Sequence, residues 1–165
     1  MMKELELMFE LKAIPAFVAG FLNGMLGTDN LPEIGACHDG LAPIVTILHD
    51  FVTDLLAFDI FKAIGDLEKF IWNFQIDFLP CTSMHEDMEA IAAWGQQFTQ
   101  PAALVPEITK NVVLHKRAIT NLWADEQAQW SAGNYYVAGQ DMAGIVTYAV
   151  GPIEPIEFYQ TLFLQ

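Results

Sequence analysis

Positive charge is scarce in this sequence. Lys and Arg number seven against 21 Asp and Glu, which gives a formal net charge of −14. None of the seven lies between residues 13 and 61, and none follows Arg117. A surface of this sign repels phosphate backbones and anionic bilayers, so we expect no nucleic acid and no membrane surface among the partners. Cations, basic proteins and neutral apolar ligands remain open.

Cysteine is nearly absent, with only Cys37 and Cys81 in the chain. No zinc-ligand spacing accompanies them, so the sequence predicts no metal site and no cofactor. Two alternatives remain for the pair. A disulfide would join two helical segments and, for a loop of this length, would contribute roughly 3–4 kcal/mol to stability. The other alternative is two free, buried thiols.

Long hydrophobic runs are missing as well. The two longest uncharged segments, Ala13–Thr28 and Ala90–Pro106, hold 16 and 17 residues. Both fall short of the roughly 20 apolar residues that cross a bilayer, so we expect no membrane span. The first ten residues, MMKELELMFE, are acidic, and no cleavable signal peptide is evident in them.

Apolar residues are abundant in spite of these absences. They make up 53% of the chain, with 12 Phe and four Trp, and their dominant spacing is three and four residues. The sequence therefore predicts an all-α protein, a single-domain helical bundle of about six to eight helices at 15–151. An N-terminal arm or helix (1–14) would precede the bundle, and an apolar C-terminal tail (152–165) would follow it.

Several helix boundaries and faces follow from local signals. Pro15 is expected to interrupt the first helical segment, and Gly20 and Gly24 to let a neighbouring helix approach residues 16–26 closely. Pro43 opens another helix, and Asn134 caps the last one. A helix over about 60–78 would bury one stripe, and most aromatic rings would lie in the core. The stripe comprises Phe61, Ile64, Leu67, Ile71, Phe74 and Phe78.

Part of the chain resembles a known group of proteins. The early segment AFVAGFLNGMLG contains an F-V-x-G-F-x-x-G pattern, and the late segment SAGNYYVAGQDMAGIVTYAVG contains Tyr135, Tyr136 and two glycines. Over roughly residues 15–151 this is similar to small helical proteins of ciliates. The glycines Gly139 and Gly144 are five apart here rather than four. The resemblance implies a helical fold and an extracellular or cell-surface location, and it supplies no catalytic residue.

Three hypotheses for function arise from the residues. The first is a non-enzymatic structural or interaction module that forms homo-oligomers, an extracellular assembly or a filament. Its apolar tail would insert into a neighbour, to which the N-terminal arm offers a matching surface. The tail residues that would make this contact are Ile153, Ile156, Phe158, Tyr159, Leu162, Phe163 and Leu164.

The second hypothesis is a carrier of a lipid or another apolar small molecule. Its cavity would lie under Phe21, Phe51, Phe61 and Phe74. The third and weakest is an enzyme whose site combines distant acids such as Asp66, Asp77 and Asp141. His49, which is followed by Asp50 and by Asp54 five residues on, is interpreted as part of a solvated helix surface.

Overall fold

The computed structural model describes residues 2–28, 34, 41–78 and 85–153. These residues form six α-helices and one short 3-10 helix, without a strand, so the all-α prediction is confirmed. The α-helices are α1 (Met2–Leu26), α3 (Ala42–Leu56), α4 (Ile60–Phe78), α5 (His85–Gly95), α6 (Pro101–Ser131) and α7 (Tyr135–Ala149), and η2 (Gln96–Thr99) is the 3-10 helix. None of the described helices combines the length and the apolarity needed to cross a membrane.

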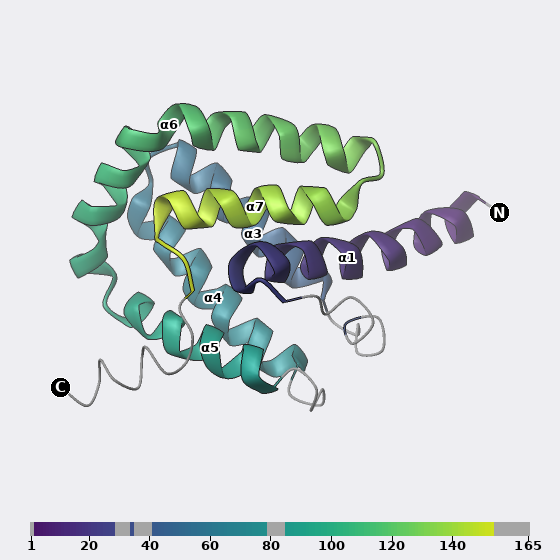
Figure 1. Ribbon diagram of the computed structural model, residues 1–165, viewed down its shortest axis with the longest axis horizontal. Coiled ribbons are helices and arrows are strands. Elements are labelled where there is room, and N and C mark those ends of the chain that lie inside the picture. The colour runs from purple at the N-terminus through teal and green to yellow at the C-terminus, as the bar shows by residue number, and fades with distance from the viewer. Residues whose placement is uncertain (1, 29–33, 35–40, 79–84, 154–165) are drawn as a thin grey trace.

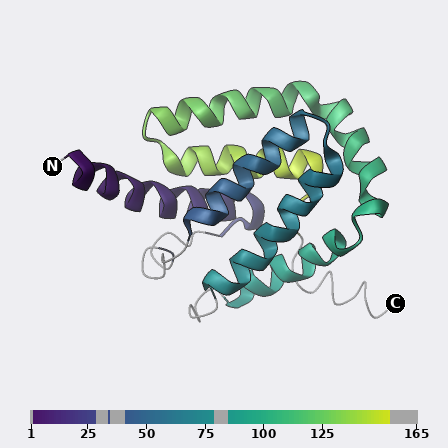
Figure 2. The same ribbon diagram turned by 180° about the vertical axis from the view of Figure 1, so that it is seen from behind.

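The helices pack in two layers. Figure 1 shows α6, α7 and α1 side by side, with α6 and α7 antiparallel and joined by a tight turn at Gly133. The helices α3 and α4 form an antiparallel pair that crosses this layer, and Figure 2 shows them from their outer side. The shorter α5 and η2 pack beside α4 at one end.

Glycines set the close contact between α1 and α7. A Cβ atom on Gly20 would overlap the carbonyl oxygen of Tyr136, and one on Gly139 would overlap that of Phe17. Gly24 lies next to the side chain of Ala143 in the same way. Side chains at these positions would force the helices apart, so the expected tight packing of the early glycines is confirmed.

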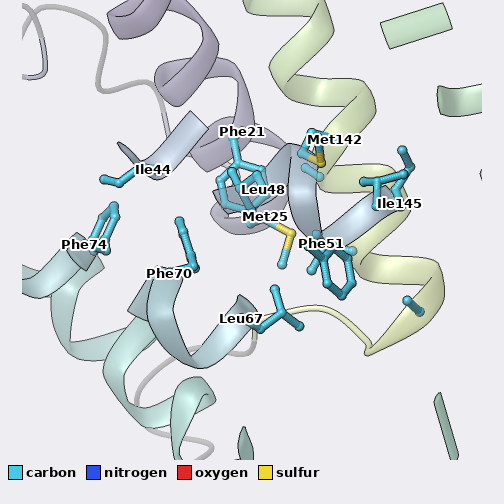
Figure 3. Close-up of a cluster of buried hydrophobic side chains, with 14 of the residues drawn as sticks. Phe21, Met25, Ile44, Leu48, Phe51, Leu67, Phe70, Phe74, Met142 and Ile145 are labelled. Carbon is cyan, nitrogen blue, oxygen red and sulfur yellow. The ribbon is translucent and has the colours of Figure 1, made fainter. Parts of the chain in front are cut away.

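One hydrophobic core lies between the two layers and joins them. Figure 3 shows side chains of α1, α3, α4 and α7 converging, among them Phe21, Phe51 and Phe74, all of which are almost inaccessible to solvent. The ring of Phe70 stands edge-on to that of Phe21 at 5.4 Å between centroids. These rings pack on one another, but Phe61 is 62% exposed, so its predicted place over an internal cavity is wrong.

Two prolines lie inside helices, and an interruption was expected at the first of them, Pro15. α1 continues through Pro15, so the boundary predicted between an arm and the bundle falls within one helix. α6 contains Pro106, and the helix is kinked at His115, where φ is −113° and ψ is 18°. Asn134 precedes α7 as predicted, but its side-chain amide donates to Oε1 of Gln129 and does not cap the helix.

Candidate functional site

An apolar stripe lies on the solvent side of α4. Phe61, Trp72 and Ile76 are 62%, 66% and 54% exposed, although they are large hydrophobic side chains. A helix turns 100° per residue, so these positions and Gly65 fall on one face. The buried residues of α4, such as Leu67 and Phe74, lie on the other side. We call Phe61, Gly65, Trp72 and Ile76 the α4 stripe.

A groove runs along the α4 stripe, between α4 and the α5–η2 segment. Its volume is about 570 Å³, and Gly65, Lys69, Trp72 and Gly95 are among the residues that line it. A Cβ atom on Gly65 would meet nothing within 4 Å, so the space above this glycine is open. A Cβ atom on Gly95 would instead overlap the side chain of Ile71, so α5 and α4 approach closely there. The volume lies within the range of small-molecule sites, roughly 300–1,000 Å³.

A partly buried pair of His49 and Glu126 lies elsewhere, between α3 and α6. Nε2 of His49 is 2.7 Å from Oε1 of Glu126, whose side chain is almost completely buried. Nδ1 of His49 is 2.8 Å from the carbonyl oxygen of Val45. Because that oxygen can only accept, Nδ1 carries a hydrogen. Nε2 then donates to the carboxylate as an imidazolium, or accepts from a protonated Glu126.

The surroundings of His49 favour its charged, imidazolium form. Burial opposes the imidazolium, but the hydrogen bond and charge of Glu126, the hydrogen bond to Val45 and the charge of Asp50 together outweigh it and raise the pKa of His49 above its usual value. Aromatic rings pack against the imidazole, since Phe17, Trp123 and Trp130 all have centroids within 5.8 Å of it. The interpretation of His49 as a solvated surface residue is therefore wrong.

Both ring nitrogens of His49 are occupied, which limits its chemistry. A general base or a metal ligand needs a free nitrogen lone pair, and here neither nitrogen offers one while the bond to Glu126 holds. A pocket of about 450 Å³ beside the pair is lined by Asp50, Gln127 and Trp130 among others. Within the described ranges, no group of three or more His, Cys, Asp or Glu side chains is arranged to hold a metal ion.

Two pairs of carboxyl groups flank the ion pair. Burial and the adjacent carboxyl of Asp54, which shares a hydrogen bond, raise the pKa of Asp66 to about 7. Burial and the carboxyl of Asp125 do the same for Asp141, whose pKa is also about 7. One pair joins α3 to α4 and the other α6 to α7, so Asp66 and Asp141 do not share a site. The side chain of Asp77 lies outside the described residues.

The predicted interaction residues fall mostly outside the described part. Ile153 is buried in its own chain, at 7% exposure. Ile156, Phe158, Tyr159, Leu162, Phe163 and Leu164 lie beyond residue 153, and so do not belong to the described residues. Cys37 and Cys81 lie outside them too, and their pairing stays a prediction.

The α4 stripe was not predicted from the sequence, although a signal for it existed. Phe61 is three residues from Ile64 and was therefore assigned to the buried face, whereas Ile60 occupies that position in the structure. Positions 61, 65, 72 and 76 also recur at helical spacing, and they form a second apolar face. α4 therefore buries one apolar face in the core and leaves the other exposed.

Comparison with known proteins gives no relative. No protein-family model, no curated protein and no solved structure shows a significant match to this chain. The resemblance to ciliate proteins, and the location that it implies, therefore stay predictions.

Proposed function

We propose that this chain is a non-enzymatic interaction module that self-associates. The observation that supports this most is the α4 stripe, where three large apolar side chains are more than half exposed beside an open groove. Exposed apolar surface of this kind marks a contact site, because hiding it from water is favourable. We propose that copies of this module build an extracellular assembly or a filament.

A second copy of the chain suits this surface better than a charged partner. The stripe itself carries no charge, and the strongly acidic remainder of the surface disfavours nucleic acid and anionic membranes. Association between copies of net charge −14 has to overcome repulsion, and salt screens that repulsion. We therefore expect self-association to strengthen as ionic strength rises, the reverse of binding to a basic partner.

The apolar tail belongs to the same proposal as a further contact. Light scattering on the full chain over a range of concentrations tests self-association directly, and a monomer at every concentration and salt level overturns the proposal. A full-length variant with Phe158→Ser, Leu162→Ser and Phe163→Ser then separates the two contacts. Loss of association in this variant assigns the contact to the tail, and its retention assigns it to the α4 stripe.

A second candidate function is the binding of an apolar small molecule. The groove beside Trp72 favours it, since its volume of about 570 Å³ suits such a ligand. Native mass spectrometry of the purified chain tests this candidate. A bound mass that Trp72→Ala removes supports it, whereas a clean 18.4 kDa chain under gentle conditions contradicts it.

A further inference from the structure

The face of α4 that bears the stripe has an internal symmetry. Phe61 and Ile76 lie equally far from the point between positions 68 and 69, and so do Gly65 and Trp72. At 100° per residue, Gly65 and Trp72 occupy the centre line of this face, and Phe61 and Ile76 lie slightly to either side. An antiparallel copy of the helix therefore places Trp72 opposite Gly65 and Phe61 opposite Ile76.

From this pattern we propose that two copies of the chain associate through α4, antiparallel about a twofold axis, with Trp72 of each copy filling the space above Gly65 of the other. The inference rests on the proposed self-association and adds its surface and geometry. α4 lies on the outer side of the molecule, as Figure 2 shows, and no other described element covers the stripe.

Trp72 and Gly65 complement each other in shape. The indole of Trp72 is 66% exposed and projects from the helix, while the space above Gly65 is open to 4 Å and continues into the groove of about 570 Å³. In a twofold interface each contact occurs twice, because residue i meets residue j and j meets i. Two tryptophans are thus buried in two grooves, and Trp is the residue type most enriched among strong interface contacts.

The area of the α4 face indicates how strong the dimer contact is expected to be. A buried aromatic side chain covers about 150–250 Å², so at two-thirds exposure Phe61 and Trp72 each contribute about 100–160 Å². With Ile76 and the flanking side chains, each copy buries about 500 Å². The total of about 1,000 Å² lies at the lower limit of specific interfaces, where complexes are weak. We expect a dissociation constant on the order of tens of micromolar.

Charges at the edges of the α4 face distinguish an antiparallel from a parallel dimer. In an antiparallel twofold pair each edge meets its own counterpart, so Glu68 lies near Glu68 of the other copy, and Lys69 near Lys69. In a parallel pair, Glu68 would lie near Lys69 of the other copy. Removing the charge of Glu68 therefore strengthens the antiparallel dimer, by about twofold, and weakens the parallel one.

Sedimentation equilibrium on the full chain tests the contact. Trp72→Ala should raise the dissociation constant by at least about 30-fold, because it removes the central contact from both copies. Leu114→Ala is the matched control, since Leu114 is an equally exposed apolar side chain, at 65%, on a different helix, α6, and its removal should leave the constant unchanged. Equal constants for Trp72→Ala and the wild type, in a chain that does associate, overturn the α4 contact but leave self-association standing.

Two further variants keep the test independent of folding. Gly65→Met adds a side chain where the space is open, so the fold should persist by circular dichroism while dimerisation falls at least about tenfold. Glu68→Gln should strengthen dimerisation beyond the effect of Glu107→Gln, an equal charge change on the exposed start of α6. Weakening by Glu68→Gln overturns the antiparallel geometry, and a chain that stays monomeric overturns both this inference and the proposed function.

Discussion

The carboxyl pair between α3 and α4 makes stability depend on pH. Asp66 is only 6% exposed, and its pKa is raised from 3.8 to about 7 by burial and by Asp54. The folded chain therefore holds a proton that the unfolded chain releases above pH 4. The stabilisation by this proton is complete below about pH 4 and is lost as pH rises through about 7.

Replacing Asp66 by Asn should remove this dependence. The amide of Asn can donate to Asp54 as the protonated carboxyl does, but it does not ionise. The difference between a pKa of 3.8 and one of about 7 corresponds to about 4 kcal/mol, and water that enters the site when Asp66 ionises reduces this energy. We expect Asp66→Asn to raise the free energy of unfolding by about 2–4 kcal/mol at pH 9, and to change it little at pH 4.

Urea denaturation at pH 4, 7 and 9, followed by circular dichroism, measures this directly. Glu107→Gln removes an exposed carboxylate and serves as the matched control, with the same pH dependence as the wild type. If Asp66→Asn lowers stability equally at all three pH values, the two carboxyls do not share a proton and the reasoning fails.

Four other substitutions test the packing and the ion pair. Glu126→Gln should lower the pKa of His49, because the bond and charge of Glu126 raise it; an NMR titration of the imidazole that shows no change contradicts this. Gly20→Ala should cost about 3 kcal/mol or more in urea denaturation through overlap with α7, whereas Gly65→Ala should stabilise α4 by up to about 1 kcal/mol; equal effects refute the contrast. Phe70→Ala should cost about 3–5 kcal/mol, and a loss under 1 kcal/mol would show that this ring is not in the core.

Local signals in the sequence predicted much of the fold. Pro43 marks the start of α3, and the predicted range 60–78 agrees with α4. The spacing of Gly20 and Gly24 predicted a close helix neighbour, because residues without a side chain let another helix approach. The prediction that Pro15 interrupts the first helix was wrong. α1 continues through it in spite of the missing amide hydrogen and the ring.

The ion pair and the exposed stripe depend on tertiary contacts. The partner of His49 is Glu126, 77 residues further along the chain, and no local spacing predicts which helices meet there. Phe61 fits two faces of α4 by spacing alone, and only the packing of the neighbouring helices, chiefly α3, decides which face is buried. His49, a polar residue next to acids in the sequence, was therefore assigned to the surface. Phe61, whose ring is exposed, was assigned to the core.

The most direct measurement of the α4 contact is the solvent accessibility of Trp72 as a function of protein concentration. Hydroxyl-radical oxidation read by mass spectrometry reports it for each residue. Trp94, at 2% exposure, is the buried reference, and Leu114 on α6 is the exposed one. We predict that oxidation of Trp72 falls several-fold as the chain dimerises, while Leu114 stays unchanged. Full oxidation of Trp72 in a sample shown to be dimeric would contradict the account.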